Sequence, residues 1–157
     1  MIFAKSSILK WIKPFIKENV GAGSVDLTLA NEFWIPKNDN QVILNERIDF
    51  KKYFVKKNCK EIVLEPGAFI LGITKEKIEL PEDVAGLLNG RSRFARFGLM
   101  VHATSSYVQP GVSNRQVFEI KNISNRSLVL KEGLRIGQII FIKCEGEGKY
   151  KGSFAKQ

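Results

Sequence analysis

Apolar and polar residues alternate in short runs along most of the chain, which is the pattern of half-buried β-strands. Residues 24–29 alternate in this way, and residues 33–35 form a strand-like apolar run that ends at Pro36. Turn-forming residues such as Asn38-Asp39-Asn40 separate one run from the next. Further strands are predicted at residues 61–64, 68–74, 77–80, 84–88, 99–102, 116–122, 128–130 and 135–143. Short strands at such close spacing predict an all-β protein, either a barrel or a sandwich.

Helical segments are few. Ser6 or Ser7 can cap a short N-terminal helix over residues 8–12, and Pro14 would end it. A helical turn or two is expected within residues 92–97. The sequence contains no internal repeat and no linker, so residues 1–157 are predicted to form one domain. Residues 145–157, rich in glycine and lysine, are expected to be a flexible tail that either frays or closes as a flap over a ligand.

Composition and charge narrow the class of protein. Hydrophobic residues make up 44% of the chain, and no apolar run approaches the roughly 20 residues of a membrane span. Cys59 and Cys144 lie far apart and no signal peptide is recognisable, so a cytoplasmic protein with reduced thiols is expected. The net charge of +9 invites a nucleic-acid interpretation. We do not favour polynucleotide binding, because the lysines are spread along the chain without the spaced aromatic residues of a stacking platform.

Two segments carry candidate chemistry. The first places Arg91, Ser92, Arg93 and Arg96 between two glycines, and guanidinium groups bind phosphate oxygens bidentately. The second places Glu119 in the strand-like run 116–120, where a carboxylate among apolar neighbours needs a partner or a use. Together they suggest an anionic ligand beside a carboxylate that moves protons.

The chain lacks the residues that several classes of catalytic site need. For a zinc site it offers only one histidine, His102, and no cysteine pair at ligand spacing. A Ser-His-Asp triad would also depend on His102, which follows an apolar run and is better explained as a structural histidine. The chain contains neither a Walker loop nor a dinucleotide-binding fingerprint.

Residues 90–102, with the sequence GRSRFARFGLMVH, strongly resemble the signature of the dCTP deaminases, which belong to the trimeric dUTPase superfamily. Residues 23–27, 64–67 and 131–138 are similar to other segments of that superfamily. The resemblance implies a distorted β-barrel subunit and a homotrimer whose active sites are shared between subunits. The implied ligand is a deoxynucleoside triphosphate carrying Mg²⁺, with dTTP as a possible feedback inhibitor.

The resemblance also implies roles for individual residues. Glu119 matches the catalytic glutamate, Ser92 the serine that holds the water and the base, and Arg96 the essential arginine near the reacting centre. The other matched positions are phosphate-binding, water-orienting or ligand-contacting, namely Arg91, Arg93, Ser105 through its carbonyl, Tyr107, Lys149 and Tyr150. For Tyr107 loop packing explains the residue equally well, and Lys149 and Tyr150 reach the phosphates only if the tail is ordered.

The chemistry agrees with this assignment. Deamination at C4 of cytosine needs an activated water and a group that shuttles protons. Without a metal to acidify the water, a carboxylate must serve as the base, and Glu119 with Arg96 and Ser92 would meet that need. The alternative is that Glu119 and Arg96 form only a stabilising ion pair.

One position departs from the family pattern. Gln109 stands where the superfamily usually has an aspartate that contacts the deoxyribose and, in dUTPases and bifunctional enzymes, activates the water that attacks the triphosphate. An amide cannot act as a base near neutral pH. We therefore favour a metal-independent dCTP deaminase that releases dUTP and ammonia. The alternatives are a dUTPase or bifunctional deaminase, and a non-catalytic nucleotide-binding protein.

Overall fold

The computed structural model describes residues 1–5, 7–8, 11–38 and 41–154, and these are mostly β-strands. The named helices among the described residues are short: the 3₁₀ turns η2 (Lys17–Asn19) and η3 (Phe50–Lys52) and the α-helix α1 (Ser92–Ala95). Ile8 is also in 3₁₀ conformation. The described part contains no helix that is long and apolar enough to cross a membrane. The strands are β1 (Ile12–Lys13), β2 (Val25–Pro36), β3 (Phe54–Asn58), β4 (Glu61–Leu64), β5 (Phe69–Glu79), β6 (Val84–Gly90), β7 (Leu99–Met100), β8 (Tyr107–Val108), β9 (Ser113–Asn122), β10 (Leu128–Lys131) and β11 (Arg135–Lys143).

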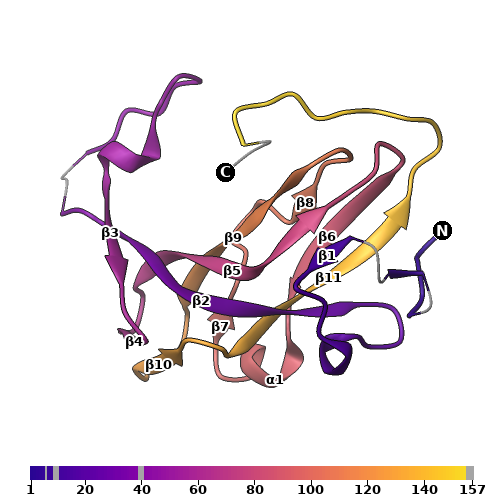
Figure 1. Ribbon diagram of the computed structural model, residues 1–157. Coiled ribbons are helices and arrows are strands. Elements are labelled where there is room, and N and C mark those ends of the chain that lie inside the picture. The colour runs from indigo at the N-terminus through magenta and orange to yellow at the C-terminus, as the bar shows by residue number, and fades with distance from the viewer. Residues whose placement is uncertain (6, 9–10, 39–40, 155–157) are drawn as a thin grey trace.

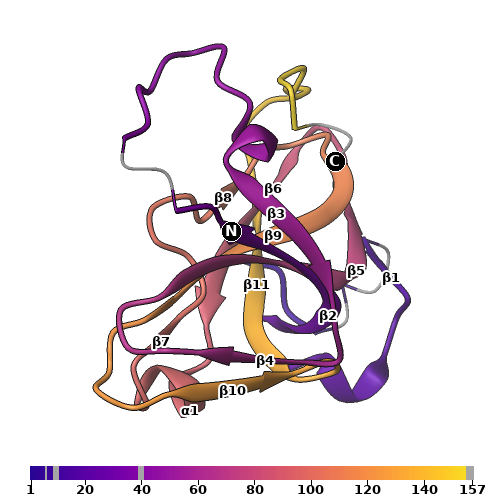
Figure 2. The same ribbon diagram turned by 90° about the vertical axis from the view of Figure 1, so that its left-hand side faces the viewer.

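The main sheet runs in the order β7-β9-β5-β2-β11-β6-β8, with β1 paired to β5 and β3 to β2. Figure 1 shows this sheet curling on itself into a half-closed, distorted barrel, and β4 and β10 form a separate two-stranded ribbon at one end. In Figure 2 residues 41–53, which precede β3, project from the body as an arm. The predictions of an all-β chain and of a distorted β-barrel are confirmed.

Alternation along the strands builds the core, because successive side chains of a strand point to opposite faces. Phe33, Phe118 and Phe141 are fully enclosed among the aliphatic side chains of neighbouring strands. Gly137 makes room for one of these rings, since a Cβ at that position would lie 2.6 Å from Cε1 of Phe118. A larger residue at 137 would displace a ring of the core.

A polar seam interrupts the pairing of β5, whose register shifts between Ile73 and Lys77. Thr74 Oγ1 accepts a hydrogen bond from the backbone N–H of Gln116 at 2.9 Å and donates to the carbonyl of Glu76 at 2.7 Å. The buried carboxylate of Glu76 accepts from the N–H of Thr28 at 2.8 Å, and its second oxygen has no hydrogen-bond partner among the described residues. Side chains therefore replace ladder hydrogen bonds where the strand bends.

Of the two helices predicted from the sequence, one is confirmed and the other differs from the structure. The turn expected within residues 92–97 is confirmed as α1. The N-terminal helix expected over residues 8–12 differs from the structure, because Ile12 belongs to β1 and pairs with Ile78 of β5. The neighbouring Trp11 packs edge-on against Phe141, with ring centroids 5.3 Å apart. Three residues of the predicted helix and its cap, Ser6, Leu9 and Lys10, lie outside the described residues.

Candidate active site

A cavity of about 370 Å³ opens where β8, β9 and the C-terminal segment meet. Leu88, Val108 and Val112 give it an apolar wall, while carboxylate, amide and hydroxyl groups line the remainder. Its size and its mixture of apolar wall and few polar groups are typical of small-molecule sites. The cavity is therefore the candidate site for a ligand of nucleotide size.

The open edge of β9 explains how this cavity collects side chains from both faces of one strand. β5 pairs along one side of β9, but β7 pairs on the other side only at Lys121 and Asn122. Beside residues 116–119 that edge has no strand partner in the described part of the chain. A ligand lying along the edge can therefore meet Glu119 and Gln116 although they point to opposite faces of the sheet.

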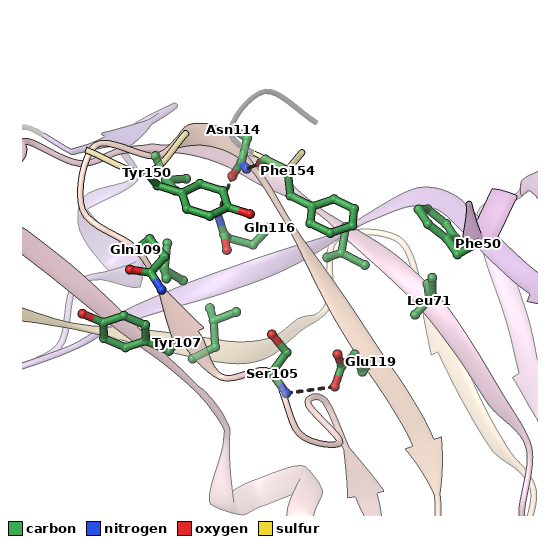
Figure 3. A pocket seen from close by; sticks show the side chains of 14 residues that line it. Phe50, Leu71, Ser105, Tyr107, Gln109, Asn114, Gln116, Glu119, Tyr150 and Phe154 are labelled. Carbon is green, nitrogen blue, oxygen red and sulfur yellow. Dashed lines mark hydrogen bonds between the residues drawn. The ribbon is translucent and has the colours of Figure 1, made fainter. Parts of the chain in front are cut away.

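Glu119 projects from β9 toward the loop that follows His102. Its Oε2 accepts hydrogen bonds from the backbone N–H groups of Ala103, Thr104 and Ser105 at 2.8, 2.9 and 3.3 Å. Figure 3 shows the bond from Ser105 at the floor of the cavity. Three N–H groups converging on one oxygen form an anion-binding loop that fixes the position of the carboxylate.

These contacts set the charge of Glu119. Partial burial is the largest single influence and raises its pKa, but the N–H groups of Thr104, Ser105 and Ala103 and the nearby His102 together lower it by more. The net pKa lies below the ordinary value of 4.5. Glu119 is therefore a carboxylate at neutral pH, which is the form a general base requires.

Five residues that the sequence singled out line this one cavity. They come from β8, the loops on either side of it, β9 and the C-terminal segment, and they are Glu119, Ser105, Tyr107, Gln109 and Tyr150. Lys149 lies instead at an adjoining hollow, with its Nζ 3.2 Å from Oε1 of Glu82. The structure thus brings together the carboxylate and most of the expected ligand-contacting groups of β8, β9 and the tail.

The arginine-rich segment is not part of the same cavity. α1 lies at the end of the sheet away from the C-terminal segment, and Ser92, Arg93 and Arg96 do not line the cavity. Glu119 and Arg96 form no ion pair within the described chain. Arg91 is held by Asp26, with Nη2 to Oδ2 at 3.0 Å, and it also donates to the carbonyl of Arg135 at 2.9 Å.

Sequence reasoning missed two residues of the cavity, Asn114 and Gln116. Asn114 Nδ2 donates to the carbonyl of Phe154 at 2.5 Å, and Gln116 Nε2 donates to Asn114 Oδ1 at 2.5 Å. The backbone N–H of Tyr150 donates to the carbonyl of Pro110 at 3.0 Å, so the C-terminal segment is attached at two places beside the cavity. Both stand at alternate positions of β9 and are buried there, whereas polar residues at alternate positions of a strand normally indicate its solvent face.

The part of the chain that the structure describes gathers no group of three or more His, Cys, Asp or Glu side chains suited to a metal ion. Near the cavity Glu119 is engaged with backbone N–H groups, and amides occupy the neighbouring polar positions. Hard cations prefer several oxygen ligands, carboxylates above all. A divalent cation at this site would thus draw its ligands mainly from a bound ligand's own oxygens.

Sequence comparison matches residues 4–144 to a family described as dCTP deaminase-like. The chain is 34% identical over 153 residues to a Coprothermobacter proteolyticus protein named dCTP deaminase, dUMP-forming, and the match covers 90% of this chain and 82% of that relative. A Methanopyrus kandleri protein of the same name is 32% identical over 151 residues, covering 88% of this chain and 78% of the relative.

Structural comparison gives the same fold. A 2′-deoxycytidine 5′-triphosphate deaminase from Agrobacterium tumefaciens superposes with a TM-score of 0.73 at 21% identity; the match covers 89% of this chain and 48% of that one. This chain thus spans about half the length of that protein. A Streptococcus mutans dUTPase superposes with a TM-score of 0.52 at 18% identity, covering 88% of this chain and 97% of that one. Since the family match extends over most of its length, the chain belongs to the dCTP deaminase-like family.

Proposed function

We propose that the protein catalyses the hydrolytic deamination of dCTP to dUTP and ammonia, with Glu119 as the proton-transferring group. The observation that carries the proposal is an ionised carboxylate held by three N–H groups at the wall of a nucleotide-sized cavity. The names of the curated relatives, which specify dCTP as their substrate, support the choice of nucleotide.

In the proposed reaction Glu119 takes a proton from a water molecule while the water oxygen bonds to C4 of cytosine, and it passes this proton to ring N3. It then takes the second proton from the new hydroxyl and gives it to the amino nitrogen. The C4–N4 bond breaks, ammonia leaves and the uracil carbonyl remains. For Glu119 to reach the water, at least one of its N–H partners in residues 103–105 has to yield.

The residues in and beside α1 enter the proposal through a second copy of the chain. Ser92, Arg93 and Arg96 are exposed and lie away from the cavity of their own subunit. A homotrimer in which α1 of one subunit approaches Glu119 of another would supply guanidinium groups, which the single-chain cavity lacks, together with the hydroxyl of Ser92. Arg96 would then stabilise the reacting centre, and Arg91 and Arg93 would lie on the phosphate side.

Mg²⁺ enters as the counter-ion of the triphosphate, held through phosphate oxygens, and it supplies charge neutralisation there. Proton transfer at C4 is assigned to Glu119, so the proposed deamination is metal-independent in its chemical step. A site that holds the deoxyribose and triphosphate of dCTP also has the groups to hold those of dTTP, which makes dTTP a candidate inhibitor.

A second candidate is a bifunctional enzyme that continues to dUMP, or a dUTPase. The observation in its favour is that the curated relatives are named dUMP-forming. The observation against it is Gln109, whose amide lines the cavity at the position where a base would be needed. A non-catalytic nucleotide-binding protein is the third candidate.

The experiment is a product assay of the purified protein with dCTP, and separately with dUTP, in the presence of Mg²⁺. Anion-exchange chromatography resolves the nucleotides, and Glu119→Gln is the control. Conversion of dCTP to dUTP that stops there is expected. Formation of dUMP from either nucleotide would establish the second candidate, and tight binding of dCTP without turnover would establish the third.

A further inference from the structure

The cavity contains a row of amides whose orientation is fixed by one backbone carbonyl. A carbonyl oxygen only accepts hydrogen bonds, so the group of Asn114 that meets the carbonyl of Phe154 must be its NH₂. The oxygen of Asn114 then faces Gln116, and Gln116 must present its own NH₂ to that oxygen. The hydrogen bond to the Phe154 carbonyl therefore determines which atom of each amide is nitrogen and which is oxygen.

The result is a hydrogen-bond acceptor aimed at the ligand space. Gln116 is buried, with 7% of its surface exposed, and its amide lines the cavity. Figure 3 shows its Oε1 on the side away from Asn114, pointing into the cavity. Its Nε2 donates to Asn114 Oδ1 at 2.5 Å and the residue is buried, so the side chain has little freedom to turn. No hydrogen bond from a described residue satisfies this oxygen, and a ligand donor can do so.

We propose that Gln116 is a specificity residue that selects pyrimidines bearing an exocyclic amino group over those bearing a carbonyl at the same position. Cytosine presents N–H donors at C4, which match the Gln116 oxygen, whereas uracil presents an acceptor there and would place two oxygens against each other. This inference rests on the proposed function for the placement of the pyrimidine next to Glu119. Both residues border the open edge of β9, which is where the base would lie.

The same geometry links selectivity to the C-terminal segment. The Phe154 carbonyl fixes the orientation of the Asn114 and Gln116 amides only while it accepts the hydrogen bond from Asn114. In the wild-type chain the cavity is therefore expected to select an amino group only while the C-terminal segment is attached. After deamination the new carbonyl at C4 faces the Gln116 oxygen, and this repulsion favours release of the product. A hydrogen bond replaced by a repulsive pair in a buried site corresponds to a preference of about tenfold or more.

The test is equilibrium binding of dCTP and of dUTP, each with Mg²⁺, measured by calorimetry. All variants carry Glu119→Gln so that the nucleotide is not consumed during the titration. Gln116→Met removes the acceptor with little change in volume. Gln41→Met makes the same chemical change at an exposed residue of the arm and is the matched control. Asn114→Asp keeps an acceptor against the Gln116 NH₂ but cannot donate to the Phe154 carbonyl.

Tighter binding of dCTP than dUTP by about tenfold or more is expected in the parent and in Gln41→Met. Gln116→Met is expected to bind both nucleotides with similar affinity. Asn114→Asp is expected to keep the preference for dCTP, because its carboxylate still accepts from the Gln116 NH₂. Its C-terminal segment should become more sensitive to protease, because the bond to the Phe154 carbonyl is lost. An unchanged dCTP/dUTP ratio in Gln116→Met, a parent without preference, or a parent that binds neither nucleotide would overturn the proposal.

Turnover separates this inference from the proposed function. If the chain with Glu119 intact deaminates dCTP but Gln116→Met leaves the binding ratio unchanged, the inference fails and the proposed function stands. If the chain with Glu119 intact does not deaminate dCTP but Gln116→Met still abolishes a measured preference for dCTP, the proposed function fails and the inference about Gln116 stands. Circular dichroism of each variant verifies folding, and a parent without preference overturns the proposal even if Gln116→Met does not fold.

Discussion

Asp26 and Arg91 form an ion pair, with Oδ2 and Nη2 3.0 Å apart, that joins β2 to the segment leading into α1. Arg135 of β11 approaches the same Oδ2 at 3.7 Å, and its carbonyl accepts a hydrogen bond from Arg91. Both partners of the Asp26–Arg91 pair are mostly shielded, with 18% and 23% of their side chains exposed. Arg91 therefore has a structural role within the chain, in addition to the phosphate contact proposed for it.

Replacing Arg91 by alanine is expected to lower the free energy of unfolding by about 2 kcal/mol, because the shielded Asp26 would keep only the more distant Arg135 and the carbonyl of Arg135 would lose its donor. Arg93→Ala is the control. Arg93 is exposed on α1, so its removal is expected to change stability by less than about 0.5 kcal/mol. Urea denaturation of both variants measures the difference, and equal stabilities would show that the Asp26–Arg91 pair contributes nothing.

Glu119→Gln is expected to reduce the rate of dCTP deamination by at least about 10²-fold, because the amide keeps the shape of the carboxylate but cannot carry a proton. The Michaelis constant should change far less, since the backbone donors of residues 103–105 can still bond the amide oxygen. Steady-state kinetics with dCTP gives both constants. Near-normal turnover in this variant would remove Glu119 from the proposed mechanism.

The pH dependence of stability follows from the lowered pKa of Glu119. A carboxylate whose pKa is lower in the folded state stabilises the fold at any pH above its unfolded value of 4.5, and this contribution is lost as the pH falls through the folded pKa. The wild-type protein should thus be more stable than Glu119→Gln at pH 7, and the difference should shrink below pH 4.5. Thermal melts of the two proteins across this range measure it; a constant difference would contradict the assigned cause.

Gln109→Asp places a carboxylate at the position where hydrolysis of the triphosphate needs a base. The variant is expected to form dUMP from dUTP faster than the wild-type protein, while dCTP deamination continues. Chromatography of the products from each nucleotide detects the change. If the wild-type protein already forms dUMP at a comparable rate, another group activates the attacking water and the interpretation of Gln109 is wrong.

Much of the sheet could be predicted, because alternation reports directly on which face of a strand is buried. The prediction for residues 135–143 coincides with β11, whose alternate residues Ile139 and Phe141 are fully enclosed. The sequence predicts two strands at residues 68–74 and 77–80, with a break at residues 75–76. In the structure one strand, β5, continues through the break, because the polar groups of Thr74 and Glu76 bond to the backbone where the register shifts.

The site was predictable only where a residue's chemistry is unusual for its surroundings. Glu119 met that condition, being a carboxylate in an apolar run. Asn114 and Gln116 did not, because polar residues at alternate positions of a strand normally indicate the solvent face. Their arrangement depends on Phe154, which is 40 residues from Asn114 in the sequence, and no local pattern contains that contact. The contact proposed between α1 and the cavity of a second copy depends on assembly, which a single sequence does not report.

The position of β11 in the sheet has a consequence for how the chain folds. β11 lies between β2 and β6, so these two strands acquire their shared neighbour only after residue 143 has been synthesised. Until then each presents an unpaired edge, which is the part of a β-protein most prone to associate with other chains. Pairing between segments so distant in sequence is also slow. We therefore expect completion of the barrel to follow synthesis, and the nascent chain to depend on protection of its strand edges during that interval.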